Sequence, residues 1–220
     1  MRRNLLSATA AVALAFAAVP SANAALMLQL SDGTTTQSAT GAGGAVTYFG
    51  AIGNFVFDVT TGLSKPLAGS ATLPLLDLNS VDVTASAGGT LTIKVTDTDF
   101  IGSGGILQFL NTVGGTMNAG SLNFNTYMDC SNAAFGTATQ LTSQAFNTGA
   151  FSGGQNTFVS GCSGNYSLTE IATLQLPGAA LISFDGSVGV PEPATLALFG
   201  SSLLVVGAAL RRRKGRKSTG

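Results

Sequence analysis

Asp97 and Asp99 are the best-placed groups for chemistry in this sequence. They lie in Thr96-Asp97-Thr98-Asp99-Phe100, after a stretch with the alternation of a β-strand. Side chains two positions apart on a strand share a face, so the two carboxylates could bind one hard cation such as calcium. Asp82 or backbone carbonyls would have to complete the coordination. The same residues also suit a turn, or a strand edge kept soluble by charge.

Catalytic constellations are otherwise sparse. The chain has no His, which excludes an imidazole base, zinc ligand or triad member. A nucleophile elbow, a P-loop and a dinucleotide-binding glycine motif are all missing from the sequence. Lys65 and Lys94 lack an S-x-x-K setting, and Glu170 has no motif around it, so we expect it to be a solvated surface acid. We predict a protein that is not an enzyme and has no cofactor other than, on one hypothesis, calcium.

Binding is the alternative function that the composition allows. Glycan sites often use an exposed aromatic platform, for which Tyr48, Tyr127 and Tyr166 are the candidates, although each also suits half-buried packing. A row of threonines at 90, 92, 96 and 98 would suit ice binding if it lined one flat strand face, but such a row is also ordinary in β-proteins.

Cys130 and Cys162 are the two cysteines of the chain. An isolated pair in an exported domain most often forms a disulfide. The bond would close a loop of about 33 residues, which the chain-entropy treatment values at roughly 3.5 kcal/mol. A reactive thiol pair is the alternative, but neither a CxxC spacing nor a local base supports it.

The elements that must position these residues are short strands. In Thr90-Leu91-Thr92-Ile93-Lys94-Val95 the apolar residues alternate with polar ones. Gly-rich segments separate many such stretches, at 41–44, 62–69, 88–89, 102–105, 114–120 and 149–154. We predict an all-β fold, an antiparallel, jelly-roll-like β-sandwich with a Phe-rich core. A parallel β-helix is the alternative, but the sequence lacks a fixed repeat.

The central part of the chain is acidic, whereas its two ends are basic. Between residues 25 and 190 there are two basic and nine acidic residues, and two minus nine gives about −7. An acidic surface repels phosphate backbones, so nucleic acid is not an expected partner.

The first 24 residues have the organisation of a secretory signal peptide. Arg2 and Arg3 precede an apolar run that ends at Ala22-Asn23-Ala24, a small-residue cleavage site. We therefore predict a signal peptide over 1–24, followed by an exported β-rich domain over 25–189. An uncleaved N-terminal anchor is the alternative.

The C-terminal region has three parts. Pro191-Glu192-Pro193 should be extended, because two prolines fix φ and remove two backbone donors. The apolar run 194–210 is long enough for a short transmembrane helix. The basic cluster that follows should stay in the cytoplasm, and it consists of Arg211, Arg212, Arg213, Lys214, Arg216 and Lys217.

These three parts together resemble the PEP-CTERM sorting signal of Gram-negative bacteria, across residues 190–217. The resemblance implies an exported protein that is held in the inner membrane, processed by a membrane-embedded exosortase near Pro191-Glu192-Pro193, and delivered to the cell surface or extracellular matrix. Hosts of this family commonly make extracellular polysaccharide, so exopolysaccharide is a further expected partner. The stretch 64–100 also resembles, diffusely, exported bodies that accompany such signals, and implies no activity.

Overall fold

The computed structural model describes residues 26–191, which form strands joined by turns and loops, with no helix among them. Ten strands lie in this range: β1 (Leu26–Ser31), β2 (Thr36–Gly41), β3 (Ala45–Ile52), β4 (Phe55–Leu63), β5 (Leu75–Ala85), β6 (Gly89–Ile101), β7 (Ile106–Asp129), β8 (Thr139–Ser160), β9 (Asn165–Leu176) and β10 (Ala180–Gly189). No helix able to cross a membrane occurs within 26–191. The prediction of an all-β fold is confirmed.

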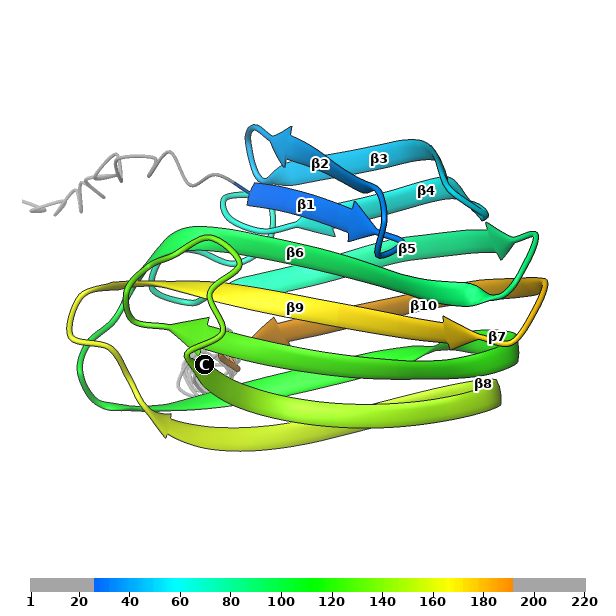
Figure 1. The fold of residues 1–220 in the computed structure, drawn as a ribbon. Coiled ribbons are helices and arrows are strands. Elements are labelled where there is room, and N and C mark those ends of the chain that lie inside the picture. Colours follow the sequence, from blue (N-terminus) through cyan, green and yellow to red (C-terminus); the bar gives the residue numbers. More distant parts are fainter. Residues whose placement is uncertain (1–25, 192–220) are drawn as a thin grey trace, which may run out of the picture.

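All ten strands belong to one antiparallel sheet (Figure 1). The hydrogen-bonded order is β2-β1-β6-β9-β7-β10-β5-β4-β3, and β8 pairs with β7 outside this path. The prediction of antiparallel pairing is therefore confirmed, but the strands form one continuous sheet instead of two separate ones.

The long hairpin of β7 and β8 folds this sheet over on itself. Residues 110–117 of β7 pair with β10, whereas residues 121–129 pair with β9. Gly120 and Gly149 have φ values of +98° and +119° at the bend, a region that favours glycine. We call the part with β2, β1, β6, β9 and residues 121–129 half-sheet A, and the part with residues 106–117, β10, β5, β4 and β3 half-sheet B. The Gly-rich segments 114–120 and 149–154 were thus wrongly predicted as breaks between strands, because glycine can also bend a strand without ending it.

The core lies between the two half-sheets, so that the fold resembles a β-sandwich in cross-section. Leu91, Ile93 and Val95 point inward and are fully buried, as the alternation predicts. Phe carries much of the packing, through the buried rings of Phe55, Phe57, Phe100, Phe109, Phe124 and Phe184. Phe49 and Phe158 are exceptions, because both are largely exposed.

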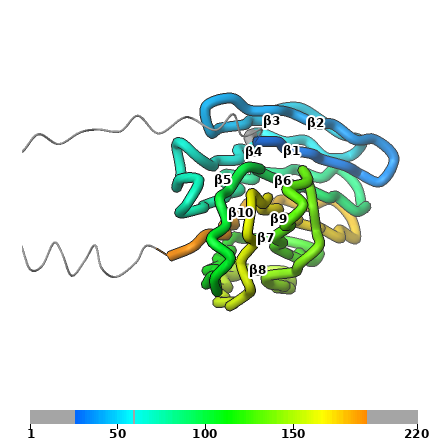
Figure 2. Tube along the Cα trace, turned by 90° about the vertical axis from the view of Figure 1, so that its left-hand side faces the viewer, coloured from blue at the N-terminus to red at the C-terminus, as the bar shows by residue number. Residues whose placement is uncertain are grey.

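The strand registers place the start and the end of the described chain at the same end of the molecule. Met27 pairs with Thr96 near the end of β6, and Gly189 pairs with Leu75 at the start of β5. The ends of β6 and β10 are joined to the 64–74 loop by bonds from Ile101 N to Ala71 O and from Val190 N to Pro74 O. We call the end of the molecule at which the described chain starts and finishes the terminal end. It also carries the loops 64–74, 102–105, 130–138 and 161–164 (Figure 2). The opposite, distal end carries the turns 32–35, 53–54, 86–88 and 177–179 and the β7–β8 bend.

Candidate functional site

Asp97 takes part in a buried ion pair at the terminal end. Its Oδ2 accepts a hydrogen bond from Lys65 Nζ at 2.9 Å and one from Ser64 Oγ at 2.6 Å. Its Oδ1 accepts the backbone N–H of Thr98 at 2.9 Å. Asp97 and Ser64 are fully buried and Lys65 is 7% exposed. Since Lys65 follows β4 and Asp97 lies in β6, the pair joins half-sheet B to half-sheet A.

The Lys65 ammonium is enclosed on its other sides as well. Nζ lies 3.7 Å from the centroid of the Phe100 ring and donates to Thr98 O. Burial lowers the pKa of Lys65, and the hydrogen bond and charge of Asp97 act in the opposite direction. An ion pair removed from water in this way depends on complete hydrogen bonding to be tolerated.

Asp99 has different partners. It has a φ of +61°, and the pairing of β6 with β9 is irregular between Asp97 and Phe100. Its Oδ1 accepts from Asn132 Nδ2 at 2.8 Å and from Asn165 Nδ2 at 3.2 Å, while its N–H donates to Asn132 Oδ1. The left-handed residue interrupts the alternation that placed the two carboxylates on one face.

A cation shared by Asp97 and Asp99 would therefore have to displace Lys65 from Asp97. No group of three or more acidic or Cys side chains suited to a metal occurs in the described range. Calcium binding stays a prediction. The hydrogen bonds of Asp99 to Asn132 and Asn165 support a structural role for this residue in a turn.

Cys130 and Cys162 form a disulfide with Cα atoms 5.4 Å apart, so this prediction is confirmed. The bond holds the start of the 130–138 loop against the 161–164 loop. The 130–138 loop then crosses the outer side of half-sheet A, where Ser167 Oγ donates to Ala133 O and Phe135 N donates to Thr96 Oγ1.

This loop rules out the row of exposed threonines. Thr96 is fully buried beneath it and also bonds to Leu168 O and Thr169, whereas Thr90 is exposed. An unbroken flat Thr face along β6 is thus absent from the described structure.

The three tyrosines do not form a platform together. Tyr166 is buried against Phe100, and burial raises its pKa. Tyr48 packs edge-on against Phe57. Tyr127 is half-buried on the outer side of half-sheet A, so it alone of the three combines outward orientation with access from that face.

Glu170 is fully buried in the core, which contradicts the expectation of a surface acid. Neither carboxyl oxygen has a hydrogen-bond partner among the described residues. Burial raises the pKa of Glu170 well above its ordinary value, and the charge of Asp77 adds to this. The nearby backbone N–H groups of Leu78 and Val188 act in the opposite direction, although neither meets the geometry of a hydrogen bond to the carboxyl. A single inward carboxyl without an opposed partner does not make the acid pair of a glycosidase.

Part of the outer side of half-sheet A presents hydroxyl and amide groups together with one cation, Lys94. Three rows run in register across β6, β9 and β7. They form what we call the polar face, composed of Thr90, Gln175 and Ser121, then Thr92, Thr173 and Asn123, then Lys94, Ile171 and Asn125. Hydroxyl and amide groups predominate, and no carboxylate is included.

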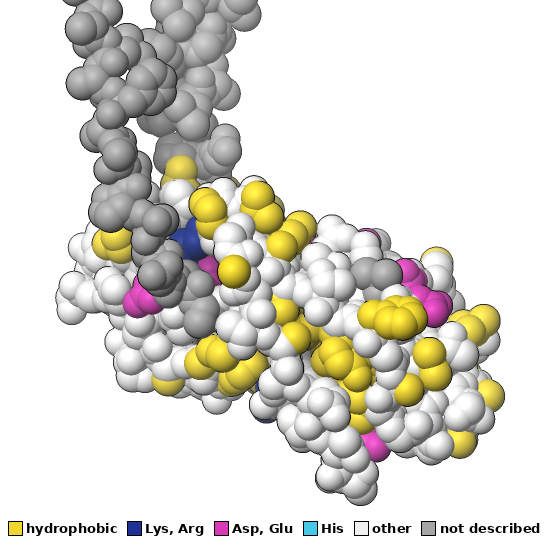
Figure 3. Space-filling model, turned by 90° about the horizontal axis from the view of Figure 1, so that it is seen from above, with side chains coloured by type: hydrophobic (Ala, Val, Ile, Leu, Met, Phe, Trp, Pro, Cys, Tyr) yellow, Lys and Arg dark blue, Asp and Glu magenta, His cyan; other side chains and the backbone are white. Residues whose placement is uncertain are grey.

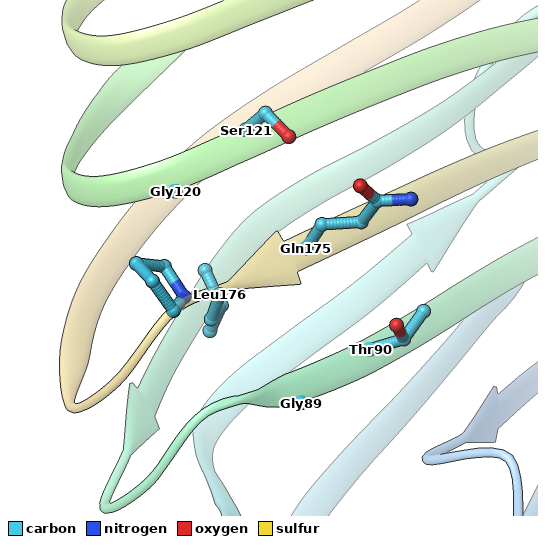
Figure 4. A pocket seen from close by; sticks show the side chains of 7 residues that line it. Gly89, Thr90, Gly120, Ser121, Gln175 and Leu176 are labelled. Atoms are coloured by element: carbon cyan, nitrogen blue, oxygen red, sulfur yellow. The ribbon is translucent and has the colours of Figure 1, made fainter.

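The distal edge of the polar face is hollowed. A shallow depression of about 720 Å³ is lined by Gly89, Thr90, Gly120, Ser121, Gln175, Leu176 and Pro177. Figure 4 shows the Gln175 side chain between Ser121 and Thr90, each on a different strand. Gly89 and Gly120 contribute backbone to the lining, and Gln175 is exposed within the depression.

The outer side of half-sheet B is acidic instead. Asp58, Asp77, Asp82 and Asp185 lie on β4, β5 and β10, outside the core. Burial and the nearby charge of Asp185 raise the pKa of Asp77. Asp58 and Asp82 line a smaller hollow of about 200 Å³ with Thr116 and Ser183. On the face that Figure 3 shows, charged side chains are sparse and lie among uncharged and scattered apolar groups.

The predicted sorting residues fall largely outside the described range. Pro191 is exposed, two residues after the end of β10. Outside the range lie the signal peptide 1–24, Glu192, Pro193, the apolar run 194–210 and the basic residues Arg211, Arg212, Arg213, Lys214, Arg216 and Lys217.

Residues 189–214 match the family description "PEP-CTERM protein-sorting motif". The chain carries a PEP-CTERM sorting motif. The predicted resemblance is thereby confirmed, and the motif indicates a protein that is exported and sorted at a membrane. It begins at Gly189, the last residue of β10, so the folded domain passes into the motif without a linker.

Comparison with curated proteins found no match. Among solved structures, the CBM22-1 xylan-binding domain of Paenibacillus barcinonensis Xyn10C is 11% identical, with 68% of this chain and 88% of that chain covered and a TM-score of 0.33. The K1 cleaved adhesin domain of Lys-gingipain from Porphyromonas gingivalis W83 is 11% identical, with coverages of 76% and 90% and a TM-score of 0.32. Tailspike protein 4 of bacteriophage CBA120 is 12% identical with a TM-score of 0.30; the match covers 72% of this chain but only 19% of the tailspike chain.

Proposed function

We propose that the described domain is a non-catalytic module of the cell surface or extracellular matrix, delivered there after exosortase processing of its C-terminal signal. The observation that carries the proposal is the direct passage from β10 into the sorting motif at Gly189. An anchor over 194–210 would then hold the folded domain close to the outer side of the inner membrane, with Pro191-Glu192-Pro193 between them.

The chemistry of the described residues supports a non-catalytic role. The buried ionisable groups are paired, as are Lys65 and Asp97, or isolated, as is Glu170. Neither arrangement presents a nucleophile and a base to an open cleft. The large depression at the distal end is lined by glycines and neutral side chains.

The test is a Glu192→Ala variant of the full chain, followed by cell fractionation in a host that has an exosortase. Insertion should remain intact, because the apolar run and the basic cluster are unchanged. Processing should fail, so that full-length precursor accumulates in the inner membrane. Thr195→Ala, three positions along, is the matched control and should be processed normally.

Normal size and export rate for Glu192→Ala would show that Pro191-Glu192-Pro193 is only a linker before a permanent anchor. Deletion of 191–220 provides the complementary result. The described strands end before this segment, so the truncated protein should be released in soluble form.

Glycan binding at the polar face is the second candidate function. Its support is the contrast between the two outer sides of the molecule: four aspartates lie on half-sheet B, and none of the nine residues of the polar face is a carboxylate. Aligned hydroxyl and amide groups can both donate and accept, as sugar hydroxyls require. Tyr127 adjoins this face.

Retention on immobilised exopolysaccharide, with and without calcium, tests the second candidate. A Gln175→Ala and Asn123→Ala double variant should lose retention, since it removes two amides from the polar face. A Ser183→Ala and Thr116→Ala double variant of half-sheet B is the matched control. Equal retention of the two double variants would exclude the polar face as the binding site.

A further inference from the structure

The buried pair at the terminal end brings together the two groups from which an amide can form. We propose that Lys65 and Asp97 condense into an intramolecular isopeptide bond, so that the exported domain carries a covalent cross-link between half-sheets B and A. The pair lies at 2.9 Å from Nζ to Oδ2, and each partner is almost or completely excluded from solvent.

The atoms of the reaction balance within the pair. A proton moves from Lys65 Nζ to Asp97 Oδ2 along their hydrogen bond, which leaves a neutral amine and a carboxylic acid. The amine lone pair attacks Cγ, and the N–C bond forms. The bond from Cγ to Oδ2 then breaks, and Oδ2 leaves as water after it has taken a second proton from the nitrogen. An ammonium and a carboxylate thus give one amide and one water, with no external reagent.

The two carboxyl oxygens of Asp97 accept hydrogen bonds from different neighbours, which suits them to different parts in the reaction. The Thr98 N–H donates to Oδ1 at 2.9 Å, where it would stabilise the negative charge that develops as Cγ becomes tetrahedral. The Ser64 hydroxyl donates to Oδ2 at 2.6 Å, on the oxygen that departs. Because the fold holds the amine against the carboxyl, the reaction is intramolecular and benefits from a high effective concentration.

Burial favours both the reaction and the persistence of its product. Two charges kept away from water are costly, and condensation removes both of them at once. The Phe100 ring covers Nζ, and Ser64 is fully buried beside the carboxyl. Water therefore has little access to the amide once it has formed.

The sequence offers a direct test on the protein purified after export, with its mature termini. Between residues 25 and 210 the basic residues are Lys65 and Lys94, and Pro66 protects the Lys65 peptide bond from trypsin. Cleavage after Lys94 therefore separates Lys65 from Asp97. After denaturation, reduction and complete digestion, a cross-linked chain should remain one species with a new N-terminus at Val95. Its mass before digestion should be one water less than the reduced sequence requires.

Lys65→Arg and Asp97→Ala should each yield two fragments under the same treatment, whereas Asp99→Asn should still give one species. The wild-type chain alone decides the outcome if either variant fails to fold. Two fragments from the wild-type chain, together with the full sequence mass, would overturn the proposal and leave the pair as an ion pair.

Discussion

The terminal and distal ends of the molecule are held together by different means. At the terminal end, the Cys130–Cys162 disulfide joins two loops, and the Lys65–Asp97 ion pair and the bonds of Asp99 to Asn132 and Asn165 tie loops and strand ends to β6. At the distal end, tight turns and the β7–β8 bend connect the strands, and a depression lined by glycines and neutral side chains lies between them. Specific cross-links thus concentrate where the chain continues into the sorting motif, and open polar surface lies at the other end.

This difference suggests a division of tasks along the strands. Under the proposed function, a domain anchored through the segment after β10 would present its distant end to extracellular material. The terminal end would keep its loops in place while the adjacent segment is processed. Substitutions at the terminal end should therefore change stability most, and those at the distal end should change it least.

The largest loss of stability is expected for Asp97→Ala. It leaves the Lys65 ammonium buried without its counter-ion, and removal of one partner from a buried pair costs about 3–5 kcal/mol. Chemical denaturation should show this as a lower midpoint. If the pair stays ionic, a Lys65→Met and Asp97→Leu double variant, which removes both charges, should recover most of the loss. If the amide forms, the double variant should stay less stable than the wild type, because it also lacks the cross-link. A loss below about 1 kcal/mol for Asp97→Ala, in the range of exposed pairs, would contradict the importance of the pair.

Chelation separates the ion pair from the calcium hypothesis. If Asp97 acts through Lys65, its substitution should cost the same with and without EDTA. If calcium binds, EDTA should lower the melting temperature of the wild-type chain, and Asp97→Asn should abolish that sensitivity.

Removal of the disulfide should have the next largest effect. A Cys130→Ser and Cys162→Ser double variant is expected to lose roughly 3.5 kcal/mol, because the bond restricts the unfolded chain. It should also free the 130–138 loop, so that amide exchange at Phe135 accelerates more than exchange in the distal turns. A uniform change of exchange at both ends would show that the bond does not act locally.

The sequence predicted the regular part of this architecture and missed the contacts that depend on the fold. Alternation placed Leu91, Ile93 and Val95 correctly, because two-residue periodicity is local. It failed at Asp99, where one left-handed residue ends the periodicity. Lys65 could not be recognised as the partner of Asp97, since the two meet only when the sheet folds over on itself.

Glu170 shows the same limit at the centre of the core. Its neighbours in the sequence, Thr169 and Ile171, give no indication that its carboxyl is buried without partners. The alternation of β9 does place it on the inner face, opposite Val95. An acid at an inward position of a clear strand is therefore a signal that could have been used.

Glu170→Gln should stabilise the protein at neutral pH. The raised pKa of Glu170 keeps its proton in the folded state while the unfolded chain loses it, so wild-type stability falls as pH rises above the ordinary Glu value. Gln does not titrate, so the gain should grow by up to about 1.4 kcal/mol per pH unit until the folded group ionises. Thermal melts from pH 4 to 8 measure it, and equal melting temperatures of the two proteins across this range would contradict the assignment.

The smallest effect is expected at the distal depression, for Gln175→Ala. The Gln175 side chain is exposed, and surface substitutions of this kind usually change stability by less than about 0.5 kcal/mol. Gly120→Ala at the same depression is the informative comparison, because a Cβ there would lie 2.5 Å from Gln175 O in a backbone with φ +98°. That substitution should cost on the order of 1–3 kcal/mol. Denaturation of both variants thus separates the backbone that shapes the depression from the side chain within it. A large loss for Gln175→Ala would mean that the distal end, too, depends on specific side-chain links, and the contrast between the ends would fail.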